Sequence, residues 1–176
     1  MKKILIGLLV VIVLLVVVGF VLPTEYEIEE RVTIQADAAR VHELVGELKR
    51  WKEWSPWEQE DPSIVTTFGP TTTGVGASQT WTSESGDGEL KFTQCDPATG
   101  IAYDMAFIMG ETRAPSTSAM KYVVAEGSTE VVWTMEGDVR DFMPPVVGGY
   151  MNIFMKMSIA SMFEQGLTKL KTVAEG

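Results

Sequence analysis

The chain opens with an unbroken apolar run and then changes to alternating hydrophobic and polar positions. Residues 4–22 are nineteen apolar residues in succession. As a helix this run would extend about 28 Å, close to the hydrocarbon thickness of a bilayer. It is longer than the apolar core of a cleaved signal peptide, and residues 18–22 hold no small-x-small cleavage pair. The pattern favours an uncleaved membrane anchor over residues 1–23, with a cleaved signal peptide as the alternative, and one domain over residues 24–176.

Two lysines set the expected orientation of this anchor. Lys2 and Lys3 precede the apolar run, and all 24 acidic residues follow it. Lysines flanking a membrane helix stay in the cytoplasm. The domain is therefore predicted to lie outside the cytoplasm, in the periplasm if the source is a Gram-negative bacterium.

Beyond Pro23, apolar side chains recur every second residue, which predicts strands. In the first strand Tyr26, Ile28, Val32 and Ile34 share one face, and Glu30 falls on the same face. After Asp37, a suitable helix N-cap, apolar residues recur at helical spacing up to Leu48. Residues 64–136 then predict about six consecutive strands, with Asp87-Gly88 as a two-residue hairpin turn. Such a meander solvates one face and buries the other.

The last long segment, Pro145 to Val173, predicts one helix, because Pro145 suits a first helical turn. One stripe is expected to face the sheet; it holds Met151, Met155, Ile159, Met162, Phe163, Gly166 and Leu170. A second apolar group lies roughly opposite, formed by Tyr150, Ile153, Phe154 and Met157. Cover on both sides of this helix is therefore expected, from the tryptophan segment described next, a membrane or a protein partner.

Three tryptophans, Trp51, Trp54 and Trp57, fall within seven residues of a connecting segment. This is a large apolar load for a connection. The segment is interpreted as core that plugs one mouth of the fold. A lid over a pocket and an interfacial membrane contact are the alternatives.

Charge excludes one class of partner. The residues after Pro23 carry 12 of the 14 basic residues and all 24 acidic ones, a formal net charge of −12. Binding to nucleic acid requires clustered cations, so nucleic acid is not an expected partner. Attraction to anionic lipid headgroups is disfavoured for the same reason.

Few residues offer catalytic or metal chemistry. His42 is the only histidine and Cys95 the only cysteine, so a conventional all-protein zinc site and a disulfide framework are both excluded. A zincin helix would need a second histidine at the position of Gly46. Neither a metal nor another cofactor is expected. Glu30 is the titratable group of most interest: strict alternation would point its carboxylate inward beside Tyr103 or Tyr122, whereas a bulge at Glu29-Glu30 would turn it outward.

The sequence motifs of residues 24–173 resemble those of the START-like, polyketide-cyclase-like (SRPBCC) superfamily, and within it those of the bacterial polyketide cyclase/dehydrase type. The similar pieces are Trp51-x-x-Trp54-Ser55-Pro56-Trp57, Asp61-Pro62, Gly74-x-Gly76-Ala77 with Trp81, Trp133-Thr134-Met135-x-Gly137, and Phe163-Glu164-x-Gly166-Leu167-x-x-Leu170-Lys171. The resemblance implies an α+β helix-grip fold, a curved antiparallel sheet of six to seven strands around the terminal helix, with an apolar cavity between them. Members bind lipids, quinones, polyketides or hormones, and some are enzymes.

The expected function is a membrane-tethered, non-catalytic module that binds a lipid-like or other apolar small molecule between the sheet and the C-terminal helix. Methionines support this interpretation, since a flexible, polarizable lining adapts to varied apolar shapes. The expected lining comprises Glu30, Trp81, Tyr103, Met105, Phe107, Met120, Tyr122, Trp133, Met135, Met155, Ile159 and Met162, with Trp51, Trp54 and Trp57 as a lid. Two alternatives stay open: a cyclase or aromatase acting through Glu30, Tyr103 and Tyr122, and a protein-interaction or envelope-stress module that docks through Tyr150, Phe154 and Met157.

Overall fold

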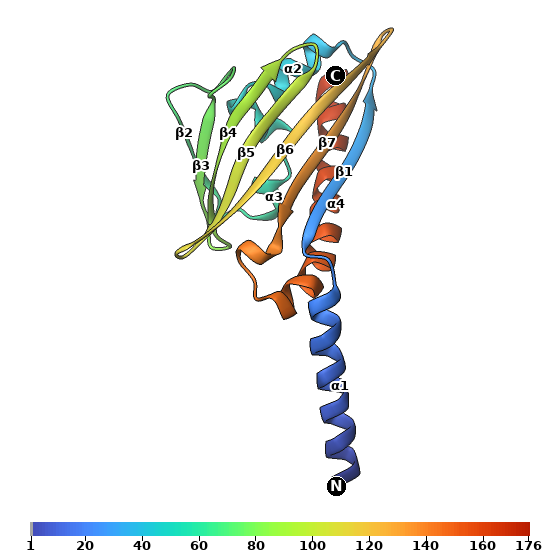
Figure 1. The fold of residues 1–176 in the computed structure, drawn as a ribbon. Coiled ribbons are helices and arrows are strands. Elements are labelled where there is room, and N and C mark those ends of the chain that lie inside the picture. The colour runs from blue at the N-terminus through green and yellow to red at the C-terminus, as the bar shows by residue number, and fades with distance from the viewer. Residues whose placement is uncertain (1) are drawn as a thin grey trace.

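A computed structural model describes residues 2–176 (Figure 1). Helix α1 (Lys2–Val21) projects from one end of the molecule, and the C-terminus lies at the opposite end. This helix is long and apolar enough to cross a membrane, and its side chains are almost all exposed. Only Leu22, Pro23 and Thr24 separate it from the first strand.

The rest of the chain builds one seven-stranded antiparallel sheet in the spatial order β1-β7-β6-β5-β4-β3-β2. One strand precedes the helical passage and six follow it, which confirms the predicted meander. The strands are β1 (Glu25–Ile34), β2 (Val65–Phe68), β3 (Ser78–Thr82), β4 (Asp87–Asp96), β5 (Gly100–Met109), β6 (Thr112–Ala125) and β7 (Ser128–Asp138).

Strand β1 keeps strict alternation along its whole length. Its register against β7 is unbroken from Glu25 opposite Asp138 to Ile34 opposite Thr129. The alternative of a bulge at Glu29-Glu30 is therefore wrong. Tyr26, Ile28 and Ile34 are buried, as expected for the inner face.

The predicted hairpin turn at Asp87-Gly88 is wrong. Strand β3 ends at Thr82 and the turn falls on residues 83–86, so Asp87 and Gly88 already belong to β4. Gly86 carries the positive φ of this turn, at 132°. Gly88 matters for a different reason. A Cβ there would overlap the indole ring of Trp81, so the missing side chain makes room for that ring.

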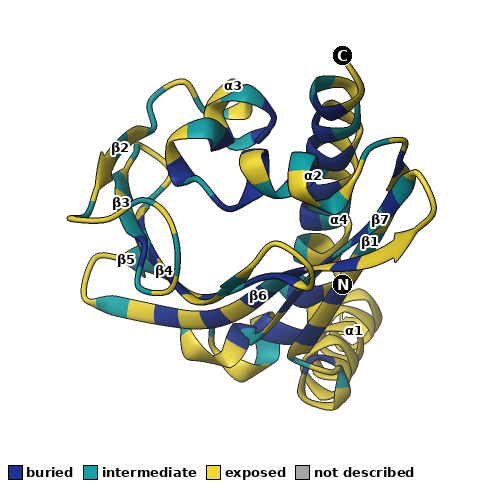
Figure 2. Cartoon of the chain, turned by 90° about the horizontal axis from the view of Figure 1, so that it is seen from above, coloured by how far each residue is buried: buried dark blue, intermediate teal, exposed yellow. Residues whose placement is uncertain are grey.

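Helices α2 (Ala38–Val45), α3 (Trp57–Glu60) and the C-terminal part of α4 (Pro145–Glu175) lie on one side of the sheet (Figure 2). Between α2 and α3 runs a 3-10 helix, η1 (Leu48–Glu53), and a second one, η2 (Val139–Asp141), precedes α4. The terminal helix thus confirms the predicted one and extends it by two residues. The predicted helix after Asp37 is shorter than expected, because it ends at Val45 and Leu48 begins η1.

Helix α4 runs beside the edge strand β1 and is bonded to it at both ends. Near its start, the Asn152 amide donates to the carbonyl oxygens of Pro23 and Glu25, at 2.9 and 3.0 Å. Near its end, Lys171 Nζ donates to Thr33 O at 2.6 Å. These bonds use edge carbonyls that no neighbouring strand reaches, and so hold the helix against the sheet.

Candidate ligand-binding site

Aromatic side chains fill much of the space between the sheet and α4. Trp133 on β7 stacks on Phe163 of α4 with 3.9 Å between ring centroids and 6° between planes. Trp54 meets the same indole at 5.6 Å, and Trp51 meets Tyr103 on β5, also at 5.6 Å. Trp133, Trp54 and Phe163 are essentially inaccessible to water. This cluster is the centre of the core.

The tryptophan segment is held by the end of α2. Trp51 Nε1 donates to Val45 O at 2.8 Å, and Trp54 Nε1 donates to Leu44 O at 3.1 Å. The last carbonyls of a helix lack partners within the helix. The two indoles satisfy them and bury their own rings at the same time, so Trp51 and Trp54 pack as core in this conformation.

A polar relay crosses the buried face of the sheet. Trp133 Nε1 lies 3.2 Å from both the Tyr103 hydroxyl and Ser118 Oγ, and it donates to them. Ser118 Oγ in turn donates to Thr134 O at 2.6 Å. Burial raises the pKa of Tyr103, so its hydroxyl stays protonated at neutral pH. Each buried polar atom of this relay has a partner, as a stable core requires.

A second polar cluster joins His42, Cys95 and Tyr122. The His42 ring lies 3.3 Å from the Tyr122 hydroxyl through Nδ1 and 3.5 Å from Cys95 Sγ through Nε2. Burial lowers the pKa of His42 and raises the pKa of both Cys95 and Tyr122. All three groups are therefore neutral near pH 7, and the Cys95 thiol is not an activated nucleophile.

We expect His42 to make stability depend on pH. Its pKa is lowered in the folded state, chiefly by burial. The unfolded chain therefore binds the proton more readily, and the free energy of unfolding falls as pH drops from 7.5 to 5.5. Urea unfolding at both pH values should show that the free energy of unfolding falls less for His42→Gln than for the wild type. Equal losses would contradict the assignment.

Glu30 lies on the inner face of β1, opposite Trp133, and is half-buried. Strand β7 separates it from Tyr122, and strands β7 and β6 separate it from Tyr103. Neighbouring strands are about 4.8 Å apart, so the strand of Glu30 lies roughly 10 Å from the strand of Tyr122 and roughly 14 Å from the strand of Tyr103. Among residues 2–176 no ion pair of Glu30 is found. The two tyrosines bond into separate clusters, so the three groups nominated for catalysis do not converge in one hydrogen-bonded set.

The expected lining residues divide into two groups by burial. The buried group comprises Tyr103, Met120, Tyr122, Trp133, Met135 and Ile159, together with Trp51 and Trp54 of the expected lid. Half-buried are Glu30, Trp81, Met105, Phe107, Met155, Met162 and Trp57. The buried group belongs to the packed centre, and the half-buried group marks where apolar side chains remain accessible.

The accessible part is clearest on strands β3 to β5. Trp81 and Phe107 meet edge to face with 6.0 Å between ring centroids. Met105 lies two residues before Phe107 on the same face of β5, opposite the buried Leu90. All three side chains pack against the core yet keep part of their surface free. We call Trp81, Met105 and Phe107 the open apolar patch.

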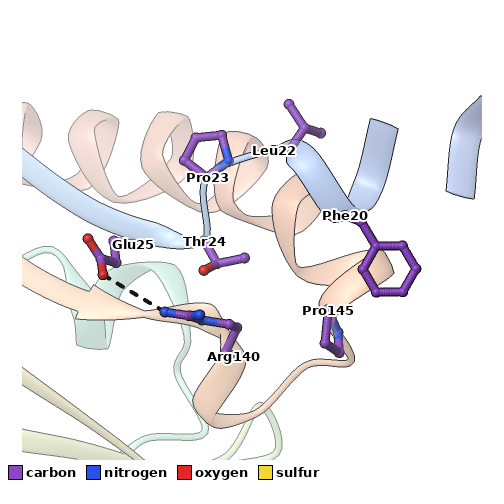
Figure 3. Close-up of a pocket in the computed structure, with 7 residues that line it drawn as sticks. All are labelled: Phe20, Leu22, Pro23, Thr24, Glu25, Arg140 and Pro145. Atoms are coloured by element: carbon purple, nitrogen blue, oxygen red, sulfur yellow. Dashed lines mark ion pairs between the residues drawn. The ribbon is translucent and has the colours of Figure 1, made fainter. Parts of the chain in front are cut away.

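Two surface pockets accompany these features, and neither is the apolar cavity expected between the sheet and α4, where aromatic side chains pack instead. The first, of about 490 Å³, sits where α1 joins the domain; Phe20 and Pro145 border it, and Arg140 pairs with Glu25 at 3.8 Å (Figure 3). The second, of about 380 Å³, lies on the outer side of α4 beside Trp54 and Pro56. In residues 2–176 no group of three or more His, Cys, Asp or Glu side chains is arranged to hold a metal ion.

A long C-terminal helix held against a curved antiparallel sheet defines a helix-grip protein. The chain belongs to the family described as polyketide cyclase / dehydrase and lipid transport, which matches residues 25–175. This confirms the resemblance inferred from the tryptophan segment and the terminal helix. A comparison with curated protein sequences gives no match.

Solved structures share the fold at low sequence identity. Protein CV1439 from Chromobacterium violaceum is 15% identical with a TM-score of 0.60, over 85% of this chain and 97% of that one. An uncharacterized protein from Rhizobium leguminosarum is 17% identical with a TM-score of 0.62, over 86% and 95%. Protein jhp0584 from Helicobacter pylori is 8% identical with a TM-score of 0.64, over 85% and 88%. At such identities the likeness concerns the fold alone.

Proposed function

We propose that the chain is a membrane-tethered, non-catalytic module that binds a lipid-like or other apolar small molecule. Residues 1–23 serve as the anchor and residues 24–176 as the ligand-binding domain, on the outer side of the membrane. The family description, which includes lipid transport, supports an apolar ligand. The observation that carries the proposal is the open apolar patch, because three large apolar side chains gathered beside the core keep part of their surface free.

The open apolar patch supports ligand contact on the inner face of strands β3 to β5. Trp81 and Phe107 offer aromatic faces, and Met105 offers a flexible thioether that adapts to different shapes. The aromatic cluster around Trp133 forms the packed floor beside them. In the proposed complex the half-buried Trp57 is the lid, since its two neighbours in the tryptophan segment are fixed to α2.

Photolabelling tests this proposal. The full chain in phosphatidylcholine nanodiscs is exposed to a palmitate analogue that carries a diazirine, and the labelled peptides are mapped by mass spectrometry. We expect labels on the peptides that contain Trp81 and Phe107, competed away by unlabelled palmitate. Phe107→Glu should reduce this labelling at least about tenfold, since a charge in an apolar site costs more than about 1.4 kcal/mol.

Ile108→Glu is the matched control, because Ile108 neighbours Phe107 but alternates onto the outer face of β5. It should label like the wild type. Labels confined to α1 and the start of α4, with none on β3 to β5, would overturn the binding site while leaving the tether intact. Circular dichroism establishes that both variants are folded.

A further inference from the structure

The first turns of α4 carry an apolar stripe that the described chain, residues 2–176, leaves largely exposed. Val147, Tyr150, Phe154 and Met157 recur at helical spacing with exposed fractions of 47%, 37%, 67% and 71%, and Ile153 beside them is 50% exposed. The fourteen residues from Phe142 to Met155 carry no charge and stand between Asp141 and Lys156. Such a surface is unusual for a face that meets water.

The stripe is continuous with the membrane helix. A Cβ on Gly19 would overlap the carbonyl oxygen of Val146, and a Cβ on Gly149 would overlap the side chain of Leu22, so the two helices meet through glycines. The Tyr150 hydroxyl donates to the carbonyl oxygen of Leu15 at 2.8 Å. Contacts of this closeness fix the start of α4 against the end of α1.

The depth of these contacts indicates the surroundings of the stripe. Leu15 lies seven residues before Leu22, the last residue of the apolar run, which is roughly 10 Å along the helix axis. A side chain that reaches Leu15 therefore enters the layer that surrounds the end of α1. The Tyr150 ring lies against Gly19, three residues before the end of the apolar run, and tyrosine is enriched at membrane–water interfaces because its ring is apolar and its hydroxyl polar.

The tryptophan segment does not cover the stripe. Its Pro56 packs near Gly166, where a Cβ would lie 3.0 Å from the proline ring. Gly166 is about 13 Å further along α4 than Met157. Of the three covers expected for this helix, a membrane and a protein partner remain, and continuity with α1 favours the membrane.

We propose that the stripe formed by Val147, Tyr150, Ile153, Phe154 and Met157 lies in the outer headgroup region of the bilayer that α1 crosses. The start of α4 is then an interfacial helix with its apolar face among the upper acyl chains. The contact is apolar rather than electrostatic, which agrees with the net charge of −12 after Pro23. The inference rests on the proposed tether and adds a second membrane contact to it.

Depth-dependent quenching tests the inference. In full-length protein with Cys95 replaced by serine, single cysteines at Phe154, Met157, Glu164 or Val13 are labelled with a nitrobenzoxadiazole dye. The protein is reconstituted in phosphatidylcholine vesicles that contain lipids with a doxyl quencher at acyl carbon 5 or 12. We expect position 13 to be quenched more by carbon 12, and positions 154 and 157 by carbon 5, each to less than half its unquenched intensity. Glu164, on the same helix roughly 15 Å beyond Phe154, is the control and should stay unquenched.

Each other outcome has a distinct meaning. Quenching at position 13 without quenching at 154 and 157 would overturn the interfacial helix and leave the tether intact. Absence of quenching at position 13 would overturn the tether itself. Disulfide formation between copies at position 154, with no lipid quenching there, would assign the stripe to a second copy and also overturn the inference.

Discussion

Trp133→Ala is expected to lower the free energy of unfolding by about 3–5 kcal/mol. The indole is 1% exposed, stacks on Phe163 and contacts Trp54. Its removal leaves a cavity between the sheet and α4 and deprives the Tyr103 and Ser118 hydroxyls of their shared donor. Urea unfolding followed by circular dichroism measures the change.

Val123→Ala is the matched control for this prediction. Val123 lies on the neighbouring strand β6, but its side chain is 56% exposed on the outer face. Its truncation should change stability by less than about 0.5 kcal/mol. A loss for Trp133→Ala close to that of Val123→Ala would show that the indole is not central to the core.

Gly100→Ala is the second substitution with a large expected effect, on the order of 3 kcal/mol or more. Gly100 has a φ of 105°, which strains any residue that has a Cβ. A Cβ there would also overlap the carbonyl oxygen of Met120 on the adjacent strand. Relief would require β5 and β6 to separate at the start of their ladder.

Gly127→Ala separates the two causes. Gly127 has a φ of 70°, yet nothing lies within 4 Å of the position of a Cβ. Gly127→Ala should lower the free energy of unfolding only by the cost of the left-handed conformation, about 1–2 kcal/mol. Urea midpoints of both variants measure the difference, and equal losses would show that the overlap with Met120 is relieved at no cost.

The pattern of the longer strands could be predicted from the sequence because one face of each is more buried than the other. In β1, Glu30 apart, and in β5 as far as Phe107, large apolar side chains alternate with charged or small ones, and the unbroken register preserves that alternation. The terminal helix was readable for a similar reason, since its apolar stripe repeats at helical spacing and Pro145 begins it. Both patterns are local, and tertiary contacts do not override them in these elements.

The wrong prediction of a turn at Asp87-Gly88 shows a limit of local sequence signals. Asp87-Gly88 has the composition of a tight turn, but Gly88 is needed inside β4 to accommodate the ring of Trp81. Turn statistics do not contain that contact, because it joins two strands across the sheet. Here a tertiary demand for space determined the use of the glycine.

The His42, Cys95 and Tyr122 cluster was missed at the sequence level. These residues lie on α2, β4 and β6, and 53 positions separate His42 from Cys95. Spacing along the chain carries no sign of their meeting. Their apolar neighbours predict burial, but only the fold reveals which buried polar groups become partners.

The joint of three residues between α1 and β1 has a consequence for transport. Leu22, Pro23 and Thr24 extend at most roughly 10 Å, and the Asn152 bond to Pro23 O shortens even that reach. If α1 crosses the membrane as proposed, a domain held this close to it cannot carry a ligand from one membrane to another. Any molecule that the tethered domain binds would then be exchanged at the leaflet it faces, and further transport would require a separate, diffusing carrier.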